Sequence, residues 1–327
     1  MKKALITGIT GQDGSYLCEL LLEKGYEVHG IVRRTSSISR GRLNNLYYDK
    51  DIYDRKLYLH YSDLNDLTSL RKIILNIEPL EIYHLAGQSH VGLSFTMPEV
   101  TAYEAGFSLL GILEILRDMK KPAKFFHASS SEIFGSPEIC PQNELTERKP
   151  INPYGASKAF ATNIVDIYRE TYSLYLVNGI MYNHESPRRG DSFVTKKICR
   201  AAAEIKFGIS SEIKLGHTNI FRDWGHAKDY VNGMWLSLQG TNPENFIFAT
   251  GELHSIEDIL TLSFEKLDLN WKDFYKFDKR FARPDEPKRL LGDPSKAEKK
   301  LKWNRSYNFK KLIDEMIEEE IHKVRKI

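Results

Sequence analysis

A tyrosine and a lysine four residues apart suggest acid–base chemistry. Tyr154 and Lys158 follow Asn152-Pro153, which is typical of a helix cap and a first helical residue, so both side chains should lie on one helix face. A phenol with a reference pKa of about 10 is a poor base at neutral pH, but a nearby ammonium favours its ionised form. The pair therefore indicates proton transfer at a hydroxyl, although the same spacing also occurs in exposed helix pairs.

Two further polar residues follow the apolar run 124–127. The Ser130 hydroxyl could bind a substrate hydroxyl or merely cap a turn. Glu132 is more informative, because a carboxylate beside a tyrosine base is superfluous for simple hydride transfer. It suggests a second proton transfer. The alternative is a surface residue or a partner in an ion pair.

Glycines recur every third residue after the first apolar run, at Gly8, Gly11 and Gly14. Without Cβ atoms such a turn can be tight and can approach a pyrophosphate closely, and the helix that follows presents its N-terminus to the anion. In this strand–turn–helix context the pattern predicts dinucleotide binding rather than a turn that merely needs glycine.

The second predicted strand ends in Arg33-Arg34-Thr35-Ser36, where NAD-binding proteins usually carry Asp or Glu. Guanidinium and hydroxyl groups there would bind a 2′-phosphate, so the sequence favours NADP over NAD, with a solvated basic loop as the alternative. Asp63-Leu64 and the run 85–89 follow later strands, where the adenine and the nicotinamide ribose should lie.

These residues need a scaffold that brings strand ends together. Strands are expected at 4–7, 27–32, 57–60, 81–85, 124–127 and 174–178, alternating with helices at 15–24, 67–77, 105–119 and 154–172. This rhythm predicts an α/β fold, a doubly wound (Rossmann) parallel sheet with a second, smaller α/β substrate domain. A helix near 195–207 follows, and the segments 226–238 and 245–249 should return to the sheet. The expected domains are 1–180 with 220–252, which would bind NADP, and 181–219 with 253–327, which would bind the substrate.

Composition narrows the class of protein. The 327 residues are 41% hydrophobic and 28% charged, which excludes a disordered chain or a fibre, and the net charge of +3 requires neither nucleic acid nor an anionic membrane as partner. The three cysteines have no paired spacing, so we expect no metal site and a reduced, cytoplasmic protein. We see no run long enough to span a membrane and no signal segment.

Over most of its length the sequence resembles the extended short-chain dehydrogenase/reductase superfamily and, within it, the GDP-mannose 4,6-dehydratase family. The resemblance rests on the runs 4–17, 25–34, 88–91, 178–179, 183–190, 193–195 and 222–231, and it weakens beyond about residue 265.

Carried over position by position, the resemblance implies a catalytic group, a set of NADP contacts and a set of GDP-sugar contacts. The catalytic group is Ser130, Glu132, Tyr154 and Lys158. The NADP contacts are Gly8, Ile9, Thr10, Gly11, Gln12, Asp13, Arg33, Arg34, Thr35, Ser36, Asp63, Leu64, Leu85, Ala86, Gly87, Gln88, Ser89, Lys158, His184 and Arg189. The substrate contacts are Asn183, Val194, Lys197, Gly216, Arg222, Arg283 and Glu286. Relatives of this kind are dimers or tetramers, so a homo-oligomer is expected.

The sequence departs from the family pattern at several positions. Ser130 replaces the usual threonine and keeps its hydroxyl, and Val100 stands where relatives often have a cofactor-contacting tyrosine. Gly92-Leu93 and residues 103–111 also differ near the expected sugar site. These changes leave open whether the substrate is GDP-mannose or the larger GDP-manno-heptose.

The expected reaction is an intramolecular redox dehydration. Tyr154 would take the C4 hydroxyl proton while hydride passes to NADP, the C4 ketone would acidify C5–H for Glu132, water would leave from C6, and the hydride would return to C6. The alternatives are a sugar-nucleotide C4 epimerase or reductase, which would not need Glu132, and a non-catalytic NADP-binding scaffold.

Overall fold

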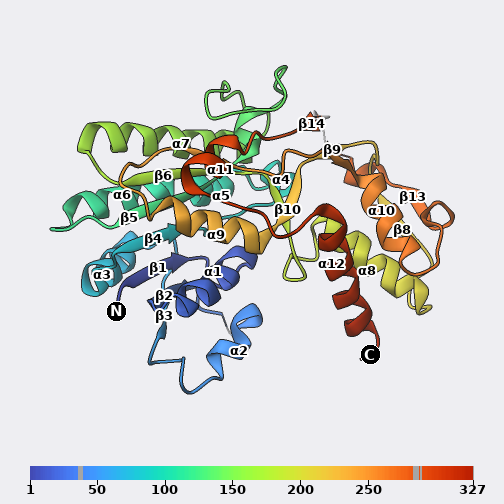
Figure 1. The fold of residues 1–327 in the computed structure, drawn as a ribbon, viewed down its shortest axis with the longest axis horizontal. Coiled ribbons are helices and arrows are strands. Elements are labelled where there is room, and N and C mark those ends of the chain that lie inside the picture. The colour runs from blue at the N-terminus through green and yellow to red at the C-terminus, as the bar shows by residue number, and fades with distance from the viewer. Residues whose placement is uncertain (36–39, 283–286, 288, 327) are drawn as a thin grey trace.

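The computed structural model describes residues 1–35, 40–282, 287 and 289–326. Within these residues seven strands form a parallel sheet in the order β11-β6-β5-β4-β1-β2-β3 (Figure 1). The strands are β1 (Lys3–Thr7), β2 (Glu27–Val32), β3 (Leu57–Tyr61), β4 (Glu81–His84), β5 (Lys124–Ser130), β6 (Leu176–Met181) and β11 (Phe246–Phe248). The chain therefore winds outward from β1 in both directions, as the alternation of strands and helices predicted.

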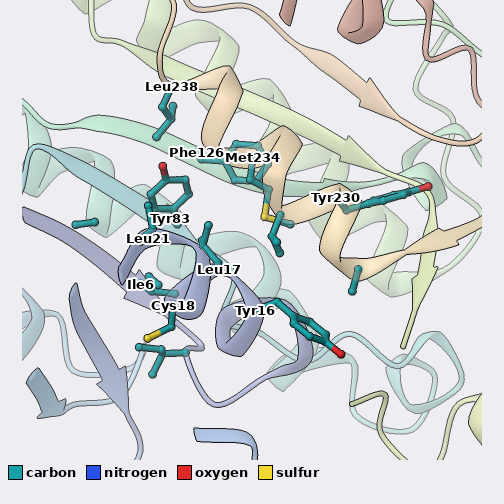
Figure 2. Close-up of a cluster of buried hydrophobic side chains, with 14 of the residues drawn as sticks. Ile6, Tyr16, Leu17, Cys18, Leu21, Tyr83, Phe126, Tyr230, Met234 and Leu238 are labelled. Atoms are coloured by element: carbon teal, nitrogen blue, oxygen red, sulfur yellow. The ribbon is translucent and has the colours of Figure 1, made fainter. Parts of the chain in front are cut away.

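Helices cover both faces of this sheet. The helices α1 (Gln12–Glu23) and α9 (Ala227–Ser237) pack on one face, where Leu17, Leu21 and Met234 meet Phe126 of the sheet (Figure 2). The helices α3 (Leu67–Ile77), α6 (Ser108–Asp118) and α7 (Pro153–Tyr172) share a second apolar cluster with the sheet. Two covered faces confirm the predicted doubly wound class.

Several elements differ from their expected bounds, including β6, which spans 176–181 rather than 174–178, and α1, which begins at Gln12 rather than at residue 15. The strand β5 continues to Ser130 rather than ending at residue 127, because Ala128, Ser129 and Ser130 stay in register with Gly179–Met181 of β6. The helix expected at 105–119 starts earlier and has three consecutive parts: α5 (Pro98–Ala102), a five-residue π-helical segment η2 (Tyr103–Phe107), and α6, which ends at Asp118. The wider π turn lies between two α-helical pieces, and apolar periodicity cannot show such a change of pitch.

A second group of elements forms its own core at one end of the sheet. The helices α8 (Val194–Lys206), α10 (Ile256–Glu265) and α12 (Phe309–Val324) pack together there (Figure 1). The short strands are β7 (Asn183–Glu185), β8 (Ile213–Leu215), β9 (Phe221–Arg222), β10 (Trp224–His226), β12 (His254–Ser255), β13 (Tyr275–Phe277) and β14 (Arg289–Leu290). The remaining short helices are η1 (Gly41–Leu43), α2 (Asn44–Tyr47), α4 (Val91–Ser94), η3 (Ser131–Phe134), η4 (Trp271–Asp273), η5 (Lys279–Phe281) and α11 (Ser295–Leu301). In the described ranges, each helix is too short or too polar to cross a lipid bilayer.

Late segments of the chain return to the main sheet. As predicted, β11 joins it, pairing with β6, and the Trp303 ring packs edge-on against Tyr230 and Phe248. Its indole N–H donates a hydrogen bond of 2.7 Å to the carbonyl oxygen of Asp229. The predicted domain boundaries stay a prediction. Trp303 lies in the range 253–327 that was assigned to the second domain, yet it packs in the core that α1 and α9 share with the main sheet.

We expect Trp303→Ala to lower the free energy of unfolding by about 3–5 kcal/mol, because it leaves a large cavity at a fully buried site and removes the hydrogen bond to the Asp229 carbonyl oxygen. Urea denaturation followed by circular dichroism measures the change. Lys299→Ala, at an exposed position of α11, is the control and should change stability by less than about 0.5 kcal/mol. Equal stability of the two variants would contradict the packing argument.

Candidate active site

A cleft of about 1020 Å³ opens where the strands of the main sheet end. Its lining includes the turns that follow β1, β2, β4 and β5 on one side, and residues of α8, β8 and β9 on the other. Because the carboxyl ends of parallel strands meet at one edge of a sheet, residues far apart in sequence face one another there.

The glycine turn has the features of a phosphate site. A Cβ atom at Gly14 would lie 2.3 Å from the carbonyl oxygen of Gly8, so the helix α1 starts in direct contact with the end of β1. Gly8 has a φ of +73°, a backbone conformation that suits glycine. No described side chain caps α1, whose N-cap Gly11 lines the cleft. A helix N-terminus of this kind presents free N–H groups to an anion, so these residues fit the pyrophosphate of a dinucleotide.

The neighbouring wall of the cleft is basic and contains unsatisfied polar atoms. Arg33, Thr35 and Arg40 line it, together with Ser62 and Asp63. Among the described residues, the hydroxyl of Ser62 and Nε of Arg40 are buried without a hydrogen-bond partner. Buried polar groups of this kind usually have a partner, so this end of the cleft suits a polar ligand.

Tyr154 and Lys158 project from the first turns of α7 into the cleft, and both are buried. The Lys158 ammonium donates a hydrogen bond of 2.8 Å to the carbonyl oxygen of Ala128, and it lies 5.9 Å from the centre of the Tyr154 ring. Burial lowers the pKa of Lys158 to about 8.

Burial also decides the protonation of Tyr154. It raises the pKa of the phenol to about 12, and a hydrogen bond with Ser130 offsets this only in part. We expected the Lys158 ammonium to favour the phenolate, but desolvation outweighs the charges around the ring. Without further positive charge at its oxygen, Tyr154 is protonated at neutral pH.

Glu132 is buried within the same cleft and held by the residue that caps α7. The Asn152 side chain accepts a hydrogen bond of 2.8 Å from the N–H of Gly155, which caps the helix, and its Nδ2 donates one of 2.8 Å to Oε2 of Glu132. Ser130 in turn accepts a hydrogen bond of 3.2 Å from the N–H of Glu132. One amide therefore connects the carboxylate to the helix that carries Tyr154. The sequence marked Asn152 only as a cap, and its second hydrogen bond had no sequence signal.

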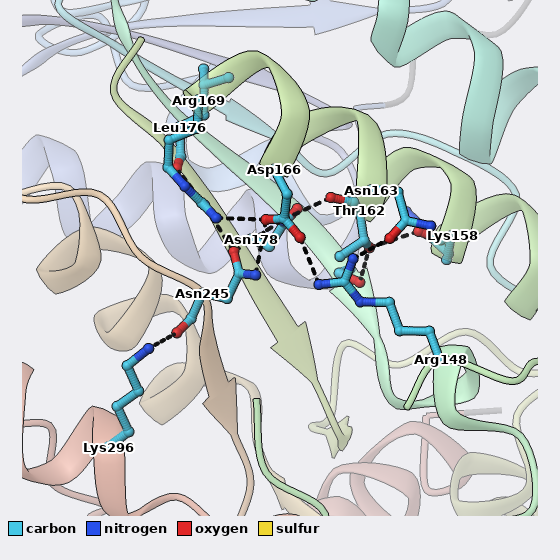
Figure 3. Close-up of polar contacts among 11 residues, drawn as sticks. Arg148, Lys158, Thr162, Asn163, Asp166, Arg169, Leu176, Asn178, Asn245 and Lys296 are labelled. Atoms are coloured by element: carbon cyan, nitrogen blue, oxygen red, sulfur yellow. Dashed lines mark hydrogen bonds and ion pairs between the residues drawn. The ribbon is translucent and has the colours of Figure 1, made fainter. Parts of the chain in front are cut away.

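A half-buried polar cluster holds α7 at Asp166 (Figure 3). The Asp166 carboxylate accepts hydrogen bonds from Arg148, Arg169, Asn178 and Asn245 at 2.6–3.0 Å. Asn178 lies in β6 and Asn245 immediately precedes β11, so this carboxylate ties the helix to the outer strands of the sheet. Side chains thus anchor α7 both at its start, through Asn152, and further along, at Asp166.

An ion pair lies under the glycine turn. Nε2 of His184 is 2.7 Å from Oδ2 of Asp13, and the His184 ring stacks on Tyr230. Burial alone would lower the pKa of His184, but the charge and hydrogen bond of Asp13 raise it above its ordinary value. Burial likewise would raise the pKa of Asp13, but His184 lowers it. Each group therefore stabilises the charged form of the other.

The opposite wall carries two cations. Arg222 is buried, lines the cleft, and donates a hydrogen bond of 2.7 Å to the carbonyl oxygen of Pro287. The Lys197 ammonium lies 3.4 Å from the centre of the Phe281 ring and donates to the carbonyl oxygen of Lys214. This wall offers positive charge and an aromatic face.

The cleft brings together most of the predicted site residues. Its lining includes Ser130, Glu132, Tyr154, Lys158, Gly8, Thr10, Gly11, Gln12, Asp13, Arg33, Thr35, Asp63, Leu64, Leu85, Ala86, Gly87, Gln88, Ser89, His184, Arg189, Asn183, Val194, Lys197, Gly216 and Arg222.

Other predicted residues lie elsewhere. Ile9 is fully buried in the core and Arg34 is exposed, and neither is among the lining residues. Ser36, Arg283 and Glu286 lie outside the described residues.

Several lining residues were not among the predicted cofactor or substrate contacts, for example Arg40, Arg42, Phe95, Phe193 and Phe281. Glu104 belongs to the range 103–111 that was expected near the sugar, but it was given no role. Most of these residues belong to loops or to the π segment, and no spacing rule predicts that such segments approach the cleft.

Sequence comparison places these observations among known proteins. A sequence model described as GDP-mannose 4,6 dehydratase matches residues 5–316. The chain is 48% identical over 325 residues to GDP-mannose 4,6 dehydratase 1 of Arabidopsis thaliana, which covers 98% of this chain and 90% of the relative. It is 45% identical to the Homo sapiens GDP-mannose 4,6 dehydratase, with 98% and 92% covered.

Solved structures share the fold at lower identity. A dTDP-glucose 4,6-dehydratase from Streptomyces venezuelae, crystallised with NAD and TYD, has a TM-score of 0.84 at 22% identity and covers 99% of this chain and 97% of its own. The Thermus thermophilus UDP-glucose 4-epimerase, in complex with NAD, has a TM-score of 0.83 at 21% identity, covering 97% and 98%.

The Asp13–His184 pair predicts a pH dependence of stability. Because folding raises the pKa of His184, the pair's contribution is full below the ordinary histidine pKa of 6.5 and is lost as the pH rises through the folded pKa. Because folding lowers the pKa of Asp13, the contribution is also lost as the pH falls through the folded pKa of that carboxyl, below 3.8. The stabilising window thus lies between these limits.

We therefore expect His184→Gln to lose about 1 kcal/mol more stability at about pH 6 than at about pH 9, measured by urea unfolding. His322→Gln, at an exposed position of α12, is the control and should follow the wild-type profile. A constant difference between His184→Gln and wild type across this range would contradict the assignment.

Proposed function

This chain belongs to the GDP-mannose 4,6-dehydratase family, and we propose that it converts GDP-mannose to GDP-4-keto-6-deoxymannose with loss of water. The observation that carries the proposal is the Glu132 carboxyl, buried in the same cleft as Tyr154 and held by Asn152. An epimerase or a reductase has no use for a second acid–base group at this position.

We propose NADP as the cofactor, held by the glycine turn and by the basic wall at Arg33 and Thr35. The uncapped start of α1 would bind its pyrophosphate, and the guanidinium of Arg33 its 2′-phosphate. When bound, NADP accepts a hydride from C4 of the sugar and returns it to C6, so it is not consumed.

Tyr154 acts on the C4 hydroxyl in this proposal. Its phenolate oxygen takes the hydroxyl proton as C4 becomes a ketone, while Ser130 hydrogen-bonds the phenol and Lys158 adds positive charge behind it. Burial disfavours the phenolate, so positive charge near the phenol oxygen is a requirement of the mechanism and not a refinement of it.

Glu132 carries out the dehydration. The C4 ketone acidifies the neighbouring C5–H, and a Glu132 oxygen takes that proton to leave an enolate. The carboxyl then gives its proton to the C6 hydroxyl, which leaves as water while the C5–C6 double bond forms. C6 receives the hydride, and C5 regains the proton that Tyr154 took from the C4 hydroxyl, so atoms and charge balance. Asn152 keeps the carboxylate oriented toward the cleft throughout by its hydrogen bond to Oε2.

The remaining polar wall binds the nucleotide diphosphate of the substrate. Arg222 and Lys197 supply positive charge to the diphosphate, and the Phe281 ring offers a face to the base. We include Asn183, Val194, Gly216, Arg283 and Glu286 in this substrate group on the basis of the family resemblance. We also propose a homo-oligomer, either a dimer or a tetramer.

The direct test is mass spectrometry of the reaction of the purified protein with GDP-mannose without added NADP. We expect many turnovers to a product lighter by one water, because the bound cofactor is regenerated. Unchanged substrate mass with a new stereochemistry would indicate an epimerase instead, and a need for stoichiometric NADP would indicate a dehydrogenase. The same assay with GDP-manno-heptose determines which sugar is preferred.

In that assay Glu132→Gln should lower dehydration by about 10²–10⁴-fold while the protein still binds GDP-mannose, because an amide cannot shuttle the proton. Glu138→Gln, at an exposed position six residues later, is the control and should match wild type. Normal turnover by Glu132→Gln would remove this residue from the mechanism.

We expect Asn152→Ser to lower kcat at least tenfold with little change in KM or stability. Serine caps helices about as well as asparagine but is too short to reach Glu132, so only the positioning contact is lost. The matched control is Asn308→Ser, because Asn308 caps α12 by the same kind of contact away from the cleft. If both variants keep full kcat, Asn152 acts as a cap only.

A further inference from the structure

An acidic residue with no role in the proposed reaction lies at the cofactor end of the cleft. Glu104 belongs to the π segment η2, and its side chain is 16% exposed. Its carbonyl oxygen accepts a hydrogen bond of 3.0 Å from the Ser108 hydroxyl. A Cβ atom at Gly87 would lie 3.2 Å from the same oxygen, so η2 abuts the loop after β4. The packing of η2 therefore fixes where the Glu104 side chain enters the cleft.

Glu104 faces a cation from another wall of the cleft. Its Oε1 lies 3.8 Å from Nη1 of Arg33, which follows β2. In the sheet, β4 and β2 lie on opposite sides of β1, whose end carries the glycine turn. The carboxylate thus reaches from the β4 side of the turn to the guanidinium on the β2 side, across the path expected for the adenosine half of a dinucleotide.

The position of Glu104 opposes the preference for NADP over NAD that Arg33 provides. A carboxylate near Arg33 neutralises part of its charge and repels a dianionic 2′-phosphate. The same oxygen can accept a hydrogen bond from a free 2′-hydroxyl, the role that an acidic residue at the end of the second strand has in NAD-binding proteins. Here the acidic group comes from the other wall.

We propose that Glu104 is a specificity-determining residue that weakens the preference of this site for NADP and lets it bind NAD as well. The inference rests on the proposed function only in placing the adenosine ribose beside Arg33.

The test is a fluorescence titration of the purified full-length protein with NADPH and with NADH at low ionic strength, where exposed charges are least screened. For Glu104→Gln we expect the ratio of the NADH to the NADPH dissociation constant to rise about tenfold, mainly through tighter NADPH binding. Glu99→Gln, which removes a carboxylate from an exposed position of α5, is the control and should keep the wild-type ratio.

A second variant tests whether Glu104 acts through its charge on the phosphate bound by Arg33 or through a change in local structure. Arg33→Met should lower the ratio, and adding Glu104→Gln to it should change the ratio much less than in the wild-type background, because both residues act on the same phosphate. Melting temperatures within a few degrees of wild type show that the variants are folded.

Several outcomes would overturn the inference. An unchanged ratio in Glu104→Gln, or an equal change in both dissociation constants, removes Glu104 as a specificity determinant while leaving the dehydration of GDP-mannose intact. A wild-type protein that binds neither nucleotide overturns the proposed function together with this inference.

Discussion

The side chain of Asn152 makes the contact on which the rest of the site depends. With its oxygen it starts the helix that carries Tyr154 and Lys158, and with its nitrogen it holds Glu132 on the preceding segment. The redox half and the dehydration half of the chemistry therefore share one anchor. A shift of this residue would move both together, which preserves their relative positions even when the cleft changes shape around a substrate.

Burial is the second constraint, and it acts on three ionisable groups near the start of α7. It raises the pKa of Tyr154 to about 12 and lowers that of Lys158 to about 8. Burial and the Lys158 charge lower the pKa of His84 to about 3, so this ring is neutral. A site of this kind responds strongly to any charge that enters it, because little solvent is available to screen it. The protein thus provides a low-dielectric site, and the protonation states of its buried groups depend on the ligand that is bound.

Much of the fold and the outline of the site could be predicted from short-range patterns. The glycine spacing, the helix cap before Tyr154 and the alternation of strands and helices are local, and the topology then brings strand ends together without further information. Contacts that depend on where a strand ends or on the pitch of a helix could not be predicted from the sequence. Arg33 lines the cleft and Arg34 does not, because successive residues of an extended chain point in opposite directions and the position where a strand ends sets which one faces inward. Glu104 enters the cleft from a π turn that interrupts a helix, and apolar periodicity does not reveal such a turn.

The place of β11 in the sheet has a consequence for the order of synthesis. Its partner β6 ends at Met181, whereas β11 begins at Phe246, so the outer edge of β6 lacks its neighbour while the intervening residues emerge from the ribosome. Trp303, which packs on Phe248, arrives later still. A nascent chain of this topology carries an open, apolar strand edge through much of translation, the kind of surface that chaperones shield from pairing with other chains.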